Sequence, residues 1–549
     1  VRAAELAHHA QQAGAAEDLV RYSRQAADEA DALGAHRESV AHLARVLAHG
    51  TWLSDTDRAD VLQRQAEVGE QCGAFEEAVA AIKEAIAARK RAGDIAGLGN
   101  ALRISARLHW LCGQSDLAER QSHDALEVLR DHSGTWQYAM ALSGQSQLDM
   151  LAERNETAVV RASEAMALAE RVGHSDIYLH ALTNLTAARC SMDVMSGIGN
   201  TLAAIAETRR RNHPDLLPRL YSNMVYVMAH DRRYESLFEY LEEGINAAIA
   251  RDNAPLEAYM RGSRALALLG LGRTQDAIGE AEFVIYGPYP QGTGRFNAQI
   301  ALARARIRAG IPEEDVLAAA RSLPTAARDI MRSAPLAIVD AEALWLGLPR
   351  PGARERLRKA FETSILSSGQ AWNLAETALW LSILGEPVPL PAETRRRLRE
   401  PYLAHITGSW REAAQSWEAL GCPYEQAIAL TTGDEAARRA AIVIFDRVGA
   451  APAAARLRRE LRASGARAIP RGPISKTRSS PAGLTGRQAE VFVLLIKGLS
   501  NAQIARRLHR STKTVEHHVS AIIAKLDVAT RGEAIHAARE RGLLDALEN

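Results

Sequence analysis

Apolar residues recur at helical spacing along the first four hundred residues, as at Val79, Ile82, Ala85 and Ile86. Positions three and four residues apart lie on one face of an α-helix, so each such stretch predicts an amphipathic helix. No segment shows the sustained alternation of apolar and polar residues that is typical of a β-strand. The pattern therefore predicts an all-α protein in which one helix follows another.

The turns between these expected helices recur at a nearly constant interval. The segment GAHRES at 34–39 resembles GAFEEA at 73–78, and further copies lie at 113–118, 154–158, 233–237 and 272–277. One small or apolar residue holds the equivalent position in every copy: Ser39, Ala78, Ala118, Ala158, Leu237 and Ala277. Successive copies are about 40 residues apart, and the copy expected near residue 198 is degraded.

A helix, a turn and a second helix with a small packing residue form a helical hairpin, and stacked hairpins build a superhelix. We therefore assign residues 1–400 to a helical repeat domain that resembles tetratricopeptide repeats, although the usual period is about 34. Residues 401–463 are the expected terminal helical segment of the array. An irregular helical bundle with accidental spacing is the alternative.

Charge is distributed unevenly along the chain. Residues 461–549 contain 15 Lys and Arg against 7 Asp and Glu, a net charge of +8, whereas the whole chain carries +1. A basic tail on a mildly acidic body indicates a polyanionic partner, and a solvated basic surface is the alternative. Within this tail, residues 464–483 are rich in Pro, Gly and Ser and contain no acidic residue. We expect this segment to be a flexible linker.

Several classes of protein are disfavoured. The sequence contains no phosphate loop, no H-E-x-x-H zinc motif and no G-x-S-x-G elbow, so we expect no enzymatic activity, no cofactor and no metal site. Its four cysteines are widely spaced, and we expect most to be buried free thiols in a cytoplasmic protein. No run of about 18 apolar residues occurs, so we expect no membrane partner.

Residues 484–549 contain four expected helix starts. Capping sequences begin at Thr485, Ser500 and Thr530, and Ser511 is a further capping candidate. The second and third helices are separated by a turn at 509–511, which is the spacing of a helix-turn-helix. We expect the third helix at about 512–525. Its apolar side consists of Val515, Val519, Ile522 and Leu526, and its outward side of Lys513, His517, Ser520 and Ala524.

The segment LTGRQAEVFVLLIKGLSNAQIARRLHRSTKTVEHHVSAIIAKLDV resembles the LuxR-type (GerE-like) helix-turn-helix domain over nearly all of 484–545. The matching motifs include Gly498-Leu499-Ser500-Asn501 and Lys513-Thr514-Val515. Departures are mild: Gln488, Phe492 and Asp527 stand where the family usually has Glu, Leu and Gly. The resemblance implies a sequence-specific DNA-binding domain.

By this resemblance the third helix reads bases through Glu516, His517 and Ser520, and the residue chemistry fits hydrogen bonding to base edges. A surface ion pair is the alternative for Glu516. Phosphate contacts are expected from Asn501, Ser511, Thr512, Lys513, Thr514, Lys525 and Arg531. Lys525 and Arg531 have the alternative of being solvated charges.

The fourth helix carries small apolar residues on more than one side: Ala534, Ile535, Ala537 and Ala538. In similar domains this helix pairs two copies of the domain, so the resemblance implies a homodimer on a two-fold related DNA site. Packing on the domain's own core is the alternative.

The arrangement of repeats followed by this domain also resembles the large ATP-binding LuxR regulators, the MalT-like group. Their N-terminal triphosphatase has no counterpart in this sequence, so ATP use is not carried over. We expect a transcription regulator whose repeat array senses a small molecule or protein. Its expected partners are double-stranded DNA, that effector and RNA polymerase. The alternatives are an interaction scaffold with only non-specific DNA binding, and the sensor and output parts of an ATP-driven switch.

Overall fold

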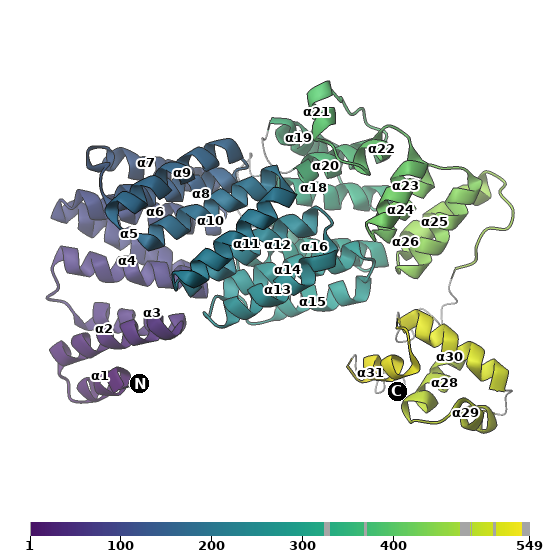
Figure 1. The fold of residues 1–549 in the computed structure, drawn as a ribbon, viewed down its shortest axis with the longest axis horizontal. Coiled ribbons are helices and arrows are strands. Elements are labelled where there is room, and N and C mark those ends of the chain that lie inside the picture. The colour runs from purple at the N-terminus through teal and green to yellow at the C-terminus, as the bar shows by residue number, and fades with distance from the viewer. Residues whose placement is uncertain are drawn as a thin grey trace. The chain divides into compact units, whose positions relative to one another are not determined.

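A computed structural model describes residues 2–322, 330–366, 371–472, 484, 486–508, 512–526 and 528–540. The chain divides into two compact units, residues 1–466 and 467–549, which we call the array and the module. Every regular element within these described ranges is helical, as the hydrophobic pattern predicts (Figure 1). Of the helices that the structure describes, none is both long and apolar enough to cross a membrane.

The first part of the array consists of paired helices. They are α1 (Arg2–Gln12), α2 (Ala16–Leu33), α3 (His36–His49), α4 (Asp55–Cys72), α5 (Phe75–Ala92), α6 (Ile95–Leu111), α7 (Ser115–Val128), η1 (Arg130–His132), α8 (Trp136–Leu151), α9 (Asn155–Val172), α10 (Ser175–Met192), α11 (Val194–Arg210), η2 (Pro214–Leu216), α12 (Leu217–His230), α13 (Tyr234–Ile249), α14 (Ala254–Gly270), α15 (Thr274–Tyr286), η3 (Thr293–Arg295) and α16 (Phe296–Ala309).

The predicted repeat is confirmed, and the copy near residue 198 is complete. Odd-numbered helices from α3 to α15 each bury their fourth residue, which is the small or apolar residue of the repeat. In α11 this position is Gly197, where an added Cβ would lie 2.1 Å from Cys190 Cα. Because only glycine allows so close an approach, the copy looks degraded in sequence although its two helices pack closely.

The turns explain why the repeat is easier to recognise in some copies than in others. Gly34, Gly73, Gly113 and Gly272 adopt positive φ two residues before the second helix of their hairpins. Glu153 and Arg232 hold the same position with φ of 59° and 60°. Non-glycine residues rarely adopt this conformation, so we expect the side chains of Glu153 and Arg232 to make contacts that a glycine could not make.

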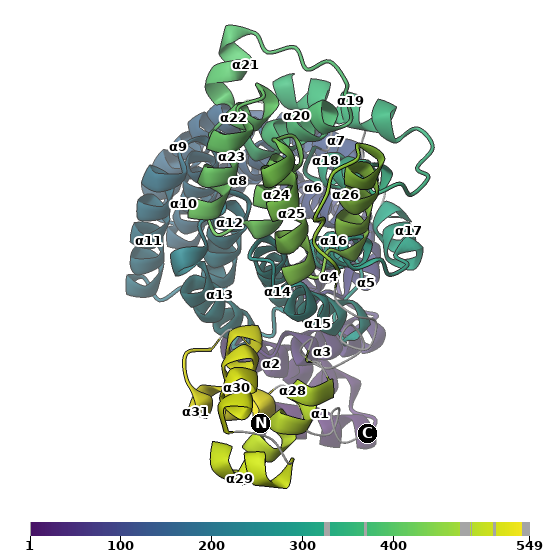
Figure 2. The same cartoon turned by 90° about the vertical axis from the view of Figure 1, so that its right-hand side faces the viewer.

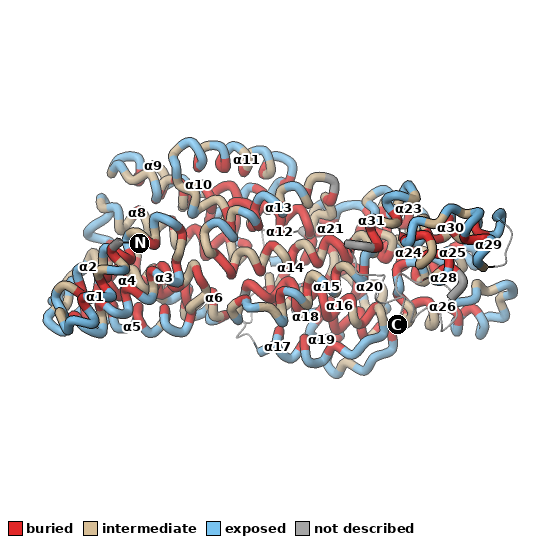
Figure 3. Tube along the Cα trace, turned by 90° about the horizontal axis from the view of Figure 1, so that it is seen from below, coloured by how far each residue is buried: buried red, intermediate tan, exposed pale blue. Residues whose placement is uncertain are grey.

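Helices of the array lie in two layers. The even-numbered helices from α6 to α16 pack against one another in succession, whereas an odd-numbered helix such as α9 packs mainly on its two sequence neighbours. Figure 3 shows the result, with buried residues concentrated along α12, α14 and α16 and exposed outer sides on α9 and α11. The inner layer therefore supplies most of the core.

The superhelix returns to itself after about 220 residues. Arg332 Nη2 donates to the carbonyl oxygen of Trp110 (3.1 Å), 222 residues earlier. Asn373 Nδ2 donates to Glu153 Oε1 (3.1 Å), and Arg232 Nη2 donates to Glu376 Oε1 (2.5 Å). Both left-handed turn residues thus bind one helix, α20, of the returning chain. Viewed at 90° to Figure 1, α9–α11 lie on one side and α17 on the other, with α13–α15 between (Figure 2).

The second part of the array has shorter and less regular helices. They are α17 (Glu314–Ser322), α18 (Ile330–Trp345), α19 (Ala353–Leu366), α20 (Ala371–Ile383), α21 (Ala392–Arg397), α22 (Tyr402–Ile406), α23 (Trp410–Ala419), α24 (Pro423–Thr431), α25 (Glu435–Arg447) and α26 (Ala451–Ala463). Buried ion pairs join them to the earlier helices. Glu342 accepts from Arg304 Nε (2.9 Å) and Arg308 Nε (2.6 Å).

The module contains four described helices: α28 (Gly486–Ile496), α29 (Asn501–Arg507), α30 (Thr512–Leu526) and α31 (Arg531–Glu540). Residues 473–483, which make up most of the expected linker, lie outside the described residues. The boundaries between the four segments expected from the sequence stay predictions.

Candidate nucleic-acid interface

One apolar core holds the module together. Phe492 from α28, Ile504 from α29, Val515 and Ile522 from α30 and Ala534 from α31 are all fully buried in it. Every helix therefore contributes to a single cluster, and the apolar stripe predicted for the third helix is the side of α30 that faces inward. The orientation of α30 is set by this burial, which directs its opposite side to solvent.

The start of α29 is fixed by a reciprocal capping pair. Gln503 N–H donates to Ser500 Oγ (3.3 Å), and Ser500 N–H donates to Gln503 Oε1 (2.8 Å). Just before it, Gly498 adopts a φ of +82° and ends α28. These contacts satisfy N–H groups that a helix start leaves unpaired. Two further predicted helix starts, Thr485 and Ser511, lie outside the described residues.

The outward side of α30 carries the predicted base-reading residues. Glu516, His517 and Ser520 are exposed, and Thr512, Lys513 and Thr514 are exposed in the first turn of the same helix. Spacing of three and four residues places Lys513, His517 and Ser520 on one face. This face is polar and lies opposite the buried stripe, which is the arrangement by which a helix enters a major groove.

Three of the predicted phosphate contacts are engaged inside the module. Arg531 donates to Asn501 Oδ1 (2.9 Å) and to the carbonyl oxygen of Leu499, which ties α31 to the start of α29. Lys525 Nζ donates to Gln488 Oε1 (2.8 Å), and partial burial lowers the pKa of Lys525. These side chains have an observed structural role, which the sequence pattern did not show because each partner lies on a different helix.

The four predicted dimerisation residues lie mainly in the module's own core. Ala534 and Ala538 are fully buried, Ala537 is 7% exposed, and Ile535 packs against the same cluster. For Ala534 and Ala538 the structure therefore shows the alternative role given above, which is packing on the module's own core. On the outer side of α31, Glu533 and His536 are exposed. Pairing of two modules through α31 stays a prediction.

Glu533 stabilises the beginning of α31. Its carboxylate accepts from the N–H of Ala529 (2.8 Å), and its own N–H donates to Thr530 Oγ1 (3.2 Å). Hydrogen bonds from Ala529 and Thr530 hold the pKa of Glu533 below its usual range. The predicted capping pair of Thr530 and Glu533 is therefore present, but the Glu533 carboxylate accepts from the N–H of Ala529, one residue before Thr530. No group of three or more His, Cys, Asp or Glu that could bind a metal occurs in the described part of the chain.

Residues 482–538 match the family described as bacterial regulatory proteins, luxR family (GerE). The module is therefore a luxR-family helix-turn-helix domain, as the resemblance predicted. Transcriptional activator protein ExaE of Pseudomonas putida is 44% identical over 62 residues, which are 11% of this chain and 29% of ExaE. Response regulator protein VraR of Staphylococcus aureus is 43% identical over 61 residues, 11% of this chain and 29% of VraR. This chain covers less than a third of either relative.

Solved structures also match the chain, and one of them covers most of it. It is a circular tandem repeat protein with novel repeat topology and enhanced subunit contact surfaces, 16% identical, covering 84% of this chain and 97% of that one. The TM-score is 0.12. At that score the two folds do not superpose, so the match adds nothing to the description of the array.

Proposed function

We propose that this chain is a transcription regulator that binds double-stranded DNA in a sequence-specific way through α30. The observation that carries the proposal is the exposed polar face of α30 in a luxR-family domain. Glu516, His517 and Ser520 are its proposed base readers. Thr512, Lys513 and Thr514 lie in the first turn of the helix, where the helix dipole favours phosphate.

The array is the proposed sensor. It forms a unit separate from the module and has its own buried surfaces, so a ligand or protein bound there can act on DNA binding only by changing how the module is presented. We propose a cytoplasmic, non-enzymatic protein that needs no cofactor, forms a dimer on DNA and acts on RNA polymerase.

Selection of duplexes from a random library by the full-length chain tests this proposal. We expect recovery of a defined sequence that the chain binds at least 10³-fold more tightly than random DNA, as specific binders do. If no sequence is enriched and affinity depends only on salt, the chain is a helical-repeat scaffold with non-specific DNA binding, and the regulator proposal is wrong.

Two substitutions separate phosphate contacts from base reading on the selected duplex. Lys513→Ala should weaken binding to all sequences alike and reduce the salt slope by about 1. His517→Ala should instead reduce discrimination at one base pair by about 1–3 kcal/mol. Lys83→Ala, an exposed lysine of α5, is the matched control and should change neither quantity.

A further inference from the structure

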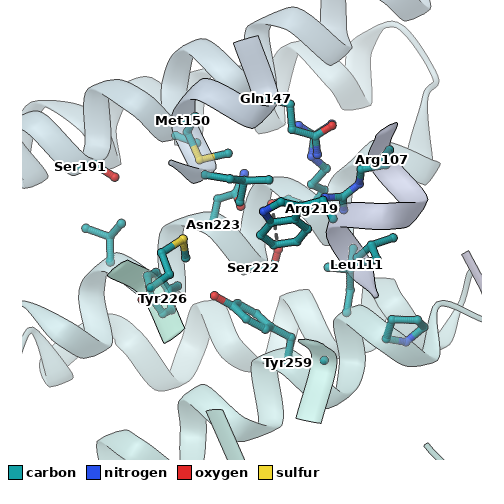
Figure 4. A pocket seen from close by; sticks show the side chains of 18 residues that line it. Arg107, Leu111, Gln147, Met150, Ser191, Arg219, Ser222, Asn223, Tyr226 and Tyr259 are labelled. Carbon is teal, nitrogen blue, oxygen red and sulfur yellow. Dashed lines mark hydrogen bonds between the residues drawn. The ribbon is translucent and has the colours of Figure 1, made fainter. Parts of the chain in front are cut away.

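A cavity of about 90 Å³ lies inside the array. Its walls come from α6, α8, α10, α12, α14, η3 and α18 (Figure 4). One enclosed water needs roughly 10–15 Å³ of such space, so the cavity has room for about six to nine waters or for a small organic molecule. The cavity lies entirely within described residues of one unit.

Most of the wall is apolar and aromatic. Trp110, Met150, Tyr226 and Tyr259 are among the lining side chains, and Figure 4 shows Tyr226 and Tyr259 across the cavity from Arg219. Ligand sites typically combine such walls with a few polar groups that fix orientation. The polar part here is basic, because the lining includes two arginines and contains neither Asp nor Glu.

The two lining arginines differ in their partners. Arg107 Nε donates to Glu70 Oε1 (2.9 Å), which neutralises its charge. Arg219 donates to the amide oxygen of Asn184, and no carboxylate of the described residues lies within ion-pair distance of it. Burial and the nearby charge of Arg107 lower the pKa of Arg219 to about 9. Because the Arg219 side chain is partly buried, leaving its guanidinium without a counter-charge is costly, and an anion in the cavity would offset part of that cost.

Asn223 also lines the cavity, and its side-chain amide has an unpaired donor. Asn223 lies four residues after Arg219 on α12, so both side chains project from one face of that helix. Asn223 Nδ2 is buried and has no hydrogen-bond acceptor. Buried donors are nearly always paired in folded proteins, so this atom marks a place for an acceptor.

We propose that this cavity binds a small organic monoanion, an aromatic or short aliphatic carboxylate. Arg219 and Asn223 donate to the carboxylate, and the apolar body packs among Trp110, Tyr226 and Tyr259. A carboxylate fits better than a phosphate ester because a single unpaired guanidinium neutralises one negative charge and the walls offer little solvation for a second. This inference rests on the sensor role proposed above and gives that sensor a ligand class.

The cavity lies where the superhelix returns to itself. Trp110 on α6 forms one wall, and Arg332 on α18 lies over its ring with the guanidinium carbon 5.1 Å from the ring centre. Met331, the neighbour of Arg332, lines the same cavity. A bound carboxylate therefore contacts both α6 and the returning helix. Such a ligand stabilises the contact between α6 and α18 to the extent that it binds more tightly when the two helices are together.

Calorimetry on the full-length chain without DNA tests the proposal. The probes are benzoate, phenylacetate and 3-phenylpropionate, each with its uncharged amide as a matched ligand, together with inorganic phosphate and methyl phosphate. We expect at least one acid to bind at least tenfold more tightly than its amide and than either phosphate. The proposal is overturned if no acid binds at millimolar concentration, or if acid and amide bind equally.

Variants then locate the site. Arg219→Gln should weaken binding of the preferred acid at least tenfold. The thermal midpoint of the ligand-free chain should stay the same or rise, because the substitution removes an uncompensated charge. Arg209→Gln, an exposed arginine of α11, is the charge-matched control and should bind like the wild type. Unchanged affinity in Arg219→Gln overturns the proposal.

Asn223→Leu serves if Arg219→Gln fails to fold. This substitution removes the unpaired donor at similar side-chain volume and should also weaken binding of the acid. Unchanged affinity contradicts the proposal. Since acid binding is measured without DNA, the two proposals fail separately. Acid binding without sequence-selective DNA binding contradicts the regulator proposal alone, and the reverse result contradicts the cavity proposal alone.

Discussion

The array and the module are both helical, but they place their chemistry differently. In the module one apolar cluster holds all four described helices, and the candidate interface is the outer side of a single helix, α30. In the array the core is divided among several separate clusters, and the candidate site is assembled from seven elements. A function carried by one helix is readable in sequence, whereas a function assembled from many helices becomes visible only in the fold.

The sharpest test of this difference is the loss of one core side chain from the module. Phe492→Ala removes a fully buried ring from the single cluster and should cost about 3–5 kcal/mol, which is most of the stability of a domain this small. We expect DNA binding by the full-length chain to be lost at 37 °C while the helical signal of the array persists.

Val493→Ala is the neighbouring control. Val493 is half-buried, and its truncation should leave DNA binding nearly intact at the same temperature. If the array also unfolds in Phe492→Ala, the two units are not independent and the comparison between them fails.

The array should instead respond to overpacking at one joint. Gly197→Ala places a methyl group against the backbone of α10, which cannot yield without moving the helix, so we expect a loss of about 3 kcal/mol. Gly199→Ala on the same helix meets no atom within 4 Å and should be neutral or stabilising. Denaturant unfolding of both variants measures the difference. A neutral Gly197→Ala would show that α10 and α11 are not packed as described.

Acid should weaken the array through its buried histidines. Burial lowers the pKa of His230 to about 3, whereas an unfolded chain has a histidine pKa of about 6.5. The unfolded state therefore binds the proton first, and this contribution to stability is complete above pH 6.5 and lost as the pH falls toward 3. The slope is at most about 1.4 kcal/mol per pH unit.

His230→Gln should reduce the dependence of array unfolding on pH between about 6.5 and 4, because this ring stacks on Trp372 (centroids 5.4 Å apart) and the positive charges of Arg232 and Arg304 oppose its protonation. His132→Gln, an exposed histidine of η1, is the control and should leave the dependence as it is. Equal slopes in the two variants would mean that His230 is accessible to protons in the folded array.

The smallest effect concerns the helix-turn-helix itself. Ser500→Ala removes the side chain that accepts from Gln503 N–H, and loss of such a cap costs about 1 kcal/mol. The module should stay folded, and its thermal midpoint should fall by several degrees. A larger loss, with DNA binding abolished at 25 °C, would show that α29 depends on this cap rather than on the apolar core.

Sequence reasoning predicted the repeat and the helices of the module well, because both depend on local periodicity. Its third helix was expected at 512–525 and extends to Leu526. The copy near 198 was interpreted as degraded because a glycine contact has no hydrophobic signature and because Asp193 caps α11 in place of the usual turn. Arg531 was expected to contact phosphate. Its hydrogen bond to Asn501 was not predicted, because the two residues are 30 apart in sequence and helical periodicity relates only residues within one helix.

The contacts between residues about 220 apart were not predictable, since arginines and carboxylates like these occur throughout the array. Glu153 and Asn373, which are 220 residues apart, have no sequence feature that distinguishes them as a pair. The cavity forms where the returning chain meets the earlier helices, so its position was not predictable from the sequence either. What sequence did indicate, that a ligand would belong to the array rather than to the module, is still a proposal.

The return of the superhelix after about 220 residues has a consequence for how this protein can evolve. An open solenoid tolerates the gain or loss of a repeat, because each repeat touches only its neighbours. Here Trp110, Glu153 and Arg232 each meet a partner from the returning chain. Deleting or duplicating one hairpin would bring every such residue opposite the wrong helix. We therefore expect the number of hairpins to be constrained, so that relatives that share this closure differ by substitution rather than by repeat count.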